Sequence, residues 1–198
     1  MPNMKNKRSY NFYALLSRMR YIERWPLMRN TQKENILEHS ADVAIFAQAL
    51  AIIDNEIFGG DADVNLAGSL ALYHDVSEVI TGDLATPVKY FNTEIKKAYK
   101  DLERVAEDKL MSMLPLALAK RYEKLMRPDV GIYEYKLVKA ADKISAYLKC
   151  VDELSAGNNE FSLAADKLRS QIAELKCREA DYFLENFTDG YGKPLDTL

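Results

Sequence analysis

The chain contains 198 residues, and its 27 basic and 30 acidic side chains leave a net charge of −3 at pH 7. Charges of both signs are mixed along its length, which argues against a nucleic-acid polymer as partner, because such proteins usually carry a basic domain or stripe. Two cysteines are too few for a disulfide framework, and no apolar run approaches the roughly 18 residues of a membrane span, so we expect a cytoplasmic protein without a membrane partner.

Apolar residues recur at steps of three and four between joints rich in Gly and Pro, which is typical of amphipathic helices. The expected helices cover residues 9–21, 35–54, 64–80, 92–113, 116–127, 133–154 and 160–187. Asp61 or Asp63 is expected to cap the third helix, and residues 81–87 form a loop by composition. This pattern predicts one all-α domain of about six to eight helices over residues 1–198, with an ordered core at about 9–187 and a loose tail at 188–198.

The two histidines of the chain stand where ligands of a metal ion are expected. His74 is followed at once by Asp75, His39 begins an apolar helical run, and Asp142 interrupts another apolar run far downstream. Imidazole nitrogen and carboxylate oxygen together suit a first-row divalent cation. The alternatives are ordinary ones, because short motifs match by chance: a satisfied core histidine, and a surface acid paired with a neighbouring lysine.

Glu78 extends this group if residues 64–80 form one helix. It would lie four residues after His74 and three after Asp75, so that the three side chains share a face. Burying them together is costly unless a cation compensates their charge. Glu78 is then placed to orient or deprotonate a water molecule, or alternatively to hold His74 in position from outside the ligand set.

Longer motifs surround these residues: RWPLMRN at 24–30, EHS at 38–40, YHDVSEV at 73–79, TGDLATPVKYFN at 81–92 and AYLKC at 146–150. Together with the order His, His-Asp and distant Asp, they resemble the HD-domain phosphohydrolases, and within them the bacterial 5′-deoxynucleotidases of the YfbR type. The resemblance runs from about Phe12 to Phe187. One departure is Ala85, where the family loop has proline, and it bears only on the rigidity of that loop.

The resemblance implies an HD-domain helical bundle that acts as a metal-dependent phosphomonoester hydrolase on deoxyribonucleoside 5′-monophosphates. It implies a homodimer and a divalent ion, with cobalt or manganese expected first and copper or zinc as alternatives. The implied metal ligands are His39, His74, Asp75 and Asp142. The implied substrate contacts are Arg24, Trp25, His39, Asp75, Asp83, Leu84, Ala85, Thr86, Lys89 and Asp142, and the implied catalytic residues are Glu78, Arg24 and Asp83.

Residue chemistry agrees with these roles and leaves alternatives open. The fork of Arg24 suits a phosphate, but Arg24 could instead be solvated and paired with Glu23. Trp25 could pack on the deoxyribose and exclude a 2′-hydroxyl, or serve as a core anchor. Asp83 could hold the 3′-hydroxyl, protonate the departing 5′-oxygen or simply cap a turn. Lys89 is a weaker phosphate ligand that could be merely solvated.

Two other functions compete with this reading. One is another HD phosphohydrolase acting on cyclic or polyphosphorylated nucleotides, which the motifs at 24–25 and 83–86 disfavour. The other is a metal-stabilised regulatory module without turnover. The expected dimer would use aromatic residues on the long helices, Tyr99, Tyr182 and Phe183, although these side chains could equally belong to the core.

Overall fold

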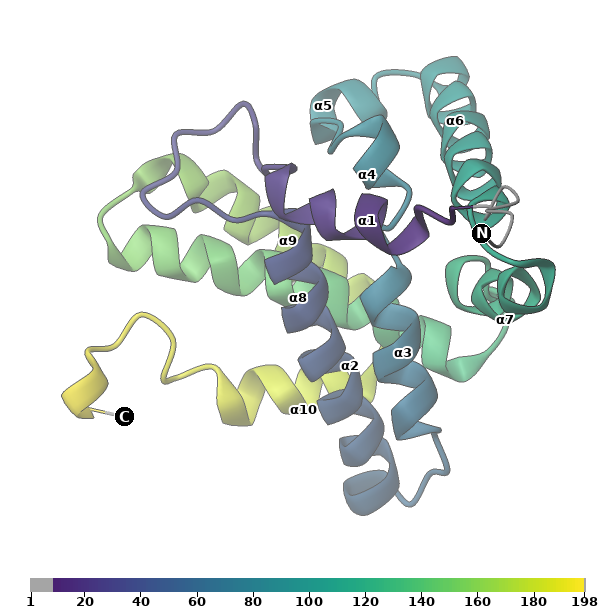
Figure 1. Cartoon of the computed structure of the whole chain (residues 1–198). Coiled ribbons are helices and arrows are strands. Elements are labelled where there is room, and N and C mark those ends of the chain that lie inside the picture. The colour runs from purple at the N-terminus through teal and green to yellow at the C-terminus, as the bar shows by residue number, and fades with distance from the viewer. Residues whose placement is uncertain (1–8, 198) are drawn as a thin grey trace, which may run out of the picture.

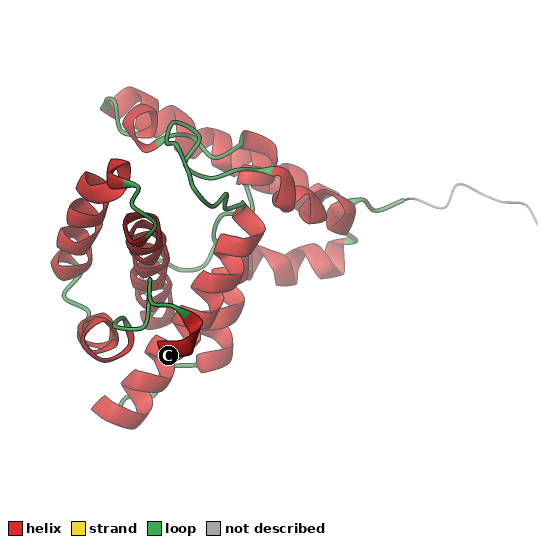
Figure 2. Cartoon of the chain, turned by 90° about the vertical axis from the view of Figure 1, so that its left-hand side faces the viewer, coloured by secondary structure: helices red, strands yellow, loops and turns green. Residues whose placement is uncertain are grey.

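The computed structural model describes residues 9–197, and residues 1–8 and 198 of the expected domain lie outside that part. Its described residues are mainly helical and contain one isolated antiparallel bridge, between Glu23 and Asn35, in place of any strand (Figure 2). The all-α expectation is confirmed. The elements in chain order (Figure 1) are α1 Phe12–Leu16, η1 Ser17–Tyr21, α2 Ile36–Phe58, α3 Val64–Tyr73, α4 Glu78–Thr81, α5 Thr86–Lys89, α6 Thr93–Ser112, α7 Leu116–Met126, α8 Tyr133–Ser155, η2 Asn159–Phe161, α9 Ser162–Glu174, α10 Arg178–Phe187 and η3 Leu195–Thr197.

Helix α2 is the centre of the main core and packs against α3, α8 and α10. Its inward face is formed by Val43, Ala47 and Leu50, all fully buried. Alanines on α2, α3 and α8 let the three helix axes approach closely, because their small side chains fill little space between the helices. Among the described helices α2 alone has the length and hydropathy of a membrane span, but its partners in the core account for its apolar character.

Local signals fix both ends of α2. Asn35 accepts hydrogen bonds from the N–H groups of Leu37 and Glu38, and the Glu38 carboxylate accepts one from the Asn35 N–H. This capping box places His39 in the first turn of the helix. Gly59 ends the helix at φ 68°, a left-handed conformation that glycine adopts without strain. Asp63 caps α3, as one of the two predicted possibilities.

The third predicted helix is shorter than expected, because α3 ends at Tyr73 and not near residue 80. The imidazole of His74 donates to the Ala71 carbonyl at 2.7 Å, and that carbonyl would otherwise accept the Asp75 N–H of a continuing helix. Residues 74–77 instead follow tight i to i−3 hydrogen bonds, including Val76 N–H to Tyr73 O. A new short helix, α4, then begins at Glu78.

Three other expected segments also differ. The first is divided into α1 and η1, and the loop at 81–87 already contains the start of α5. The last predicted helix is two helices, because Lys176 adopts φ 49° between α9 and α10. After α10 the chain turns, and Tyr191 packs against the main core.

The aromatic residues expected at a dimer surface belong instead to the core. Tyr99 and Phe183 are each only 6% exposed, and Tyr182 stacks edge-on against Phe58 at a centroid separation of 6.0 Å. The apolar faces of these helices are therefore buried against other parts of the same chain, and these three side chains give no support to dimerisation.

The loop between η1 and α2 is tied to α8 by one buried acid. The Glu153 carboxylate is 1% exposed and accepts hydrogen bonds from the backbone of Thr31 and Gln32, the Thr31 hydroxyl, the Asn158 amide and the Lys149 ammonium. Although burial raises the pKa of Glu153, the bonds from Lys149 and Thr31 hold it well below its ordinary value. The loop therefore has a fixed position although it lacks regular structure.

Candidate active site

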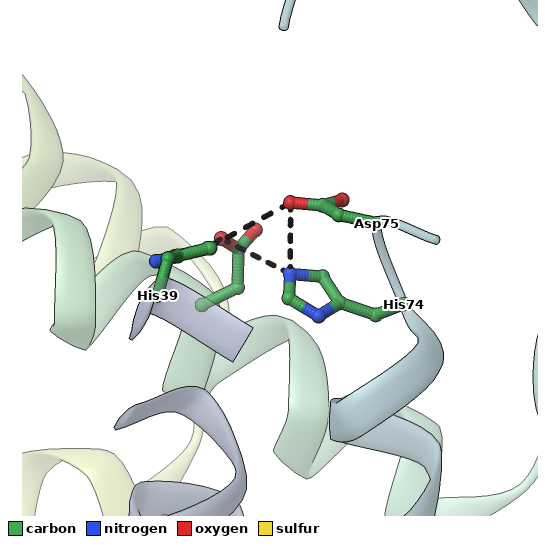
Figure 3. A group of neighbouring side chains, drawn as sticks. His39, His74 and Asp75 are labelled. Atoms are coloured by element: carbon green, nitrogen blue, oxygen red, sulfur yellow. Dashed lines mark hydrogen bonds and ion pairs between the residues drawn. The ribbon is translucent and has the colours of Figure 1, made fainter. Parts of the chain in front are cut away.

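The four predicted metal ligands meet at one point between α2, α8 and the turn after α3 (Figure 3). His39 Nε2 lies 3.2 Å from Asp142 Oδ1 and 3.7 Å from Asp75 Oδ2. His74 Nε2 lies 3.1 Å from Asp75 Oδ2 and 3.8 Å from Asp142 Oδ1. One ligand atom from each residue lies within 4.8 Å of all the others. Asp142 is thus paired with the histidines rather than with a neighbouring lysine.

The outer nitrogens of both imidazoles are held by the protein. His74 Nδ1 must carry a proton, because it donates to the Ala71 carbonyl, so Nε2 is the nitrogen that faces the cluster and could offer its lone pair to a cation. His39 Nδ1 is hydrogen-bonded to the Ser145 hydroxyl at 3.1 Å, which directs its Nε2 to the same point. Such outer partners orient the ligands of metal sites. Ser145, one turn after Asp142 on α8, was not identified from the sequence.

The electrostatics of the cluster fit a cation. His74 Nε2 is buried and makes no hydrogen bond within the described part of the chain. Burial lowers the pKa of His74, but the carboxylates of Asp75 and Asp142 outweigh this effect and raise it to about 10. Burial likewise raises the pKa of Asp75, and His74 holds it well below its usual range. Two carboxylates and two directed imidazoles therefore favour positive charge at their centre, and this nitrogen and oxygen set suits a first-row divalent ion.

Glu78 lies beside this cluster at the first position of α4. Its side chain is 5% exposed, and its Oε2 makes no hydrogen bond with any described residue. Burial raises the pKa of Glu78 to about 9, and the charges of Asp75 and Asp83 act in the same direction. The turn at 74–77 places Glu78, rather than the continuous helical face that the sequence suggested.

Arg24 points from its loop toward the cluster. Its Nε donates to Glu34 at 3.0 Å, and its Nη1 lies 3.7 Å from Asp75 Oδ2. The predicted alternative partner, Glu23, instead forms an exposed ion pair with Lys33. Burial lowers the pKa of the Arg24 guanidinium, but Glu34 and Asp75 raise it above its ordinary value. Glu34 therefore holds Arg24 as a cation beside the Asp75 carboxylate, with Nη1 turned toward the cluster.

Trp25 adopts φ 57°, an unfavourable backbone conformation for a bulky residue. Its indole Nε1 donates to Glu34 Oε2 at 3.1 Å, and its ring meets Phe161 edge-on at a centroid separation of 5.4 Å. The backbone of Trp25 lies near Asp83 and lowers the pKa of its carboxyl group, in opposition to burial. Trp25 is half-buried at the edge of a small cluster around Phe161, so it is neither a free surface ring nor a central core anchor.

The predicted substrate loop, which begins at Asp83, lies next to Arg24 and Trp25. Burial raises the pKa of Asp83, while Arg24 opposes that shift. Leu84 and Ala85 are half-buried and Thr86 is exposed. Lys89 is not simply solvated, because its ammonium donates to Glu103 at 3.0 Å and lies 4.5 Å from the centroid of the Tyr99 ring.

A cavity of about 310 Å³ opens beside the four-residue cluster, with His74 and Asp75 in its wall. Lysines from three helices line it, among them Lys89 and the half-buried Lys139. Lys139 lies one turn before Asp142 on α8, and this spacing is the signal that could have identified it from the sequence. A smaller hollow of about 140 Å³ is lined by Arg24 and Trp25.

A family model described as 5′-deoxynucleotidase YfbR-like matches residues 11–191. The chain belongs to this family. A 5′-deoxynucleotidase of Vibrio vulnificus is 50% identical over 193 residues, which cover 95% of this chain and 97% of the relative. The 5′-deoxynucleotidase YfbR of Shigella dysenteriae is 48% identical over 189 residues, covering 95% of both chains. The expected family is thus confirmed.

Solved structures show the same HD-domain fold. An HD-domain phosphohydrolase of Listeria innocua superposes with a TM-score of 0.80 at 27% identity, covering 89% of this chain and 86% of its own. The HD phosphohydrolase DatZ of cyanophage S-2L, bound to dA and one catalytic Zn²⁺, gives a TM-score of 0.62 at 21% identity, covering 87% and 93%. At that identity the phage enzyme supports the fold alone.

We predict that the four-residue cluster binds a divalent ion and that the ion stabilises the folded chain. An ion present at 100 times its dissociation constant should add about 2.7 kcal/mol to the free energy of unfolding. Asp142→Asn should lose most of this gain, because it removes one charged ligand, whereas Asp152→Asn at the exposed far end of α8 should keep it. Thermal unfolding with and without metal measures both. Equal stabilisation of the two variants would contradict the site.

Proposed function

We propose that this 5′-deoxynucleotidase family member hydrolyses deoxyribonucleoside 5′-monophosphates to deoxyribonucleosides and phosphate at one divalent ion held by His39, His74, Asp75 and Asp142. The observation that carries the proposal is the convergence of these four ligand atoms from three distant segments. Relatives named as 5′-deoxynucleotidases, 47% to 50% identical over 95% of the chain, support the activity.

Each residue around the ion is proposed to have a separate role in hydrolysis. When bound, a divalent ion lowers the pKa of water and neutralises charge on the phosphoryl group. Glu78 orients or deprotonates the attacking water through its unpartnered oxygen, and the positive charge of a bound ion would lower its raised pKa and favour the carboxylate form that a general base needs. Arg24 donates its fork to the phosphate oxygens beside Asp75. Asp83 holds the 3′-hydroxyl or gives a proton to the departing 5′-oxygen, and burial raises its pKa, which favours the protonated form that the second role needs.

Trp25 is proposed to distinguish the sugar. Its indole is fixed next to Arg24, so a phosphate bound by Arg24 brings the pentose against this ring. A rigid ring packed on C2′ leaves no space for a 2′-hydroxyl. Shape exclusion in a pocket generally discriminates by about a hundredfold or less. The loop from Asp83 to Thr86, with Lys89 after it, is proposed to close over the nucleotide.

The ligand chemistry does not choose one metal, because imidazole and carboxylate accept several first-row ions. We propose cobalt or manganese, with zinc and copper as alternatives. The competing functions, hydrolysis of cyclic or polyphosphorylated nucleotides and a regulatory module without turnover, are disfavoured by family membership and by the presence of Glu78 and Arg24 around the ligands. Metal stabilisation without phosphate release from any nucleotide would favour the module.

The family resemblance also leads us to propose a homodimer in the cytoplasm, without a nucleic-acid or membrane partner. Sedimentation equilibrium at micromolar concentration is expected to give twice the chain mass of 22.6 kDa. A mass of one chain would remove the dimer from the proposal without affecting the proposed reaction.

Glu78→Ala and Glu78→Gln should lower kcat for deoxyribonucleoside monophosphates by about 10² to 10⁴, the usual contribution of a general base. Metal-dependent stabilisation should persist in both variants, because the four ligands remain. Glu94→Gln, at an exposed carboxylate near the start of α6, is the matched control. Phosphate release and thermal unfolding are measured on the same samples. Loss of metal stabilisation together with activity would instead assign Glu78 to the support of His74.

Wild-type protein should release phosphate faster from deoxyribonucleotides than from matching ribonucleotides, and chelator should abolish both. Trp25→Phe should reduce the preference, because the smaller ring leaves space near C2′. The ratio of kcat/KM for each deoxy and ribo pair is the measurement, over a panel of bases and metals. Equal rates on both sugars in the wild type would refute the role of Trp25 while leaving the hydrolytic assignment intact.

A further inference from the structure

One oxygen of a buried carboxylate holds both members of the Arg24–Trp25 pair. Glu34 Oε2 accepts a hydrogen bond from Arg24 Nε at 3.0 Å and another from Trp25 Nε1 at 3.1 Å. The Glu34 side chain is only 11% exposed. Two donors occupy both lone pairs of this oxygen, and the charge of the acceptor strengthens each bond.

The backbone fixes the position of Glu34. Its carbonyl accepts the Arg24 N–H at 2.9 Å, and the neighbouring residues Glu23 and Asn35 form the isolated bridge. Asn35 is also the cap of α2, whose first turn carries His39. The carboxylate of Glu34 therefore has a set distance and direction relative to the helix that supplies a proposed metal ligand.

The indole of Trp25 depends on this carboxylate for its orientation. Nε1 is the single polar atom of the ring, and Glu34 is its acceptor. The packing of the ring against the cluster around Phe161, including the edge-on approach to Phe161 itself, is apolar and supplies no directional bond. The left-handed backbone of Trp25 is itself unfavourable, so bonds to its surroundings are needed to keep it in place.

We propose that Glu34 is a positioning residue that sets the selectivity for deoxyribose by fixing the indole of Trp25. The inference rests on the proposed function of Trp25 and extends it to a residue that does not touch substrate. Without the carboxylate, the ring can turn away and leave space for a 2′-hydroxyl. Arg24 also loses its Nε anchor, which weakens phosphate binding equally for both sugars, so the two effects separate in the kinetics.

Three variants test the proposal in the full-length, metal-loaded protein. Glu34→Ala removes the acceptor, and Glu34→Gln keeps an uncharged one. Glu23→Gln is the matched control, since it neutralises an exposed carboxylate of the same loop that pairs only with Lys33 among the described residues. Zinc serves as the loading ion for optical work, because its filled d shell leaves fluorescence unaffected by unpaired electrons.

Two readouts are combined. The first is the ratio of kcat/KM for a deoxyribonucleotide and the matching ribonucleotide. The second is the fluorescence of Trp25, the single tryptophan of the chain, measured as anisotropy and as quenching by acrylamide. The fluorescence is recorded with and without metal and substrate, so it reports the position of the ring independently of turnover.

Glu34→Ala should lower the deoxy-to-ribo ratio by about tenfold, within the range that shape exclusion supplies. It should also lower the anisotropy, increase quenching and raise KM for both sugars. Glu34→Gln should show the same changes to a smaller extent, because its amide oxygen still accepts. Glu23→Gln should match the wild type. Thermal unfolding checks that each variant is folded, and Glu34→Gln carries the test if Glu34→Ala does not fold.

An unchanged ratio and unchanged quenching in a folded Glu34 variant would overturn the inference. Failure of the proposed function looks different. If Trp25→Phe keeps the wild-type preference, the role of Trp25 is wrong; if Trp25→Phe loses it while Glu34→Ala keeps it, only the role of Glu34 is wrong. A general loss of activity in Glu34→Ala with an intact ratio would assign Glu34 to Arg24 alone and likewise reject the selectivity role.

Discussion

The structure depends on bringing two carboxylates and two imidazoles within 4.8 Å of one another inside a helical core. Two carboxylates this close repel, and their removal from water is costly, so the cluster favours a compensating positive charge and requires a rigid frame. Alanine-rich faces of α2, α3 and α8 provide that frame, because fully buried small residues such as Ala47, Ala71 and Ala141 permit close helix packing. The close packing of these helices therefore also sets the positions of the four side chains in the cluster.

The break after α3 follows from the same requirement. A continuous helix would give the Ala71 carbonyl to the Asp75 N–H, whereas here it accepts the proton of His74 Nδ1. That bond turns Nε2 toward the ligands, and the tight turn that follows brings Asp75 Oδ2 to 3.1 Å from it. One hydrogen bond thus selects the tautomer, ends the helix and allows two adjacent residues to contribute to one centre.

Periodicity and capping signals predicted most helices, because burial of one helical face is a local property of the sequence. The closeness of His39, His74, Asp75 and Asp142 could also be predicted, since isolated polar residues in apolar runs stand out. The sequence does not show when a side chain takes a backbone carbonyl from the helix, so the end of α3 was predicted at the wrong residue. The left-handed conformation of Lys176 likewise has no signal in the neighbouring residues. Tyr99 and Phe183 were expected at the surface because a helical pattern identifies an apolar face but not the element that covers this face.

The loop between η1 and α2, which carries Arg24 and Trp25, shares its supports with the proposed metal centre. Helix α8 carries the proposed ligand Asp142 and, about three turns later, the buried Glu153 that accepts hydrogen bonds from the backbone of this loop. Helix α2 carries His39 one turn after Asn35, and Asn35 follows Glu34 directly. Each helix therefore carries one proposed ligand and is also joined to the loop, α8 through Glu153 and α2 through its cap Asn35. A displacement of α8 relative to α2 would alter the coordination geometry and the Arg24–Trp25 pair together, so binding of the ion and order in the loop favour the same packing of these two helices.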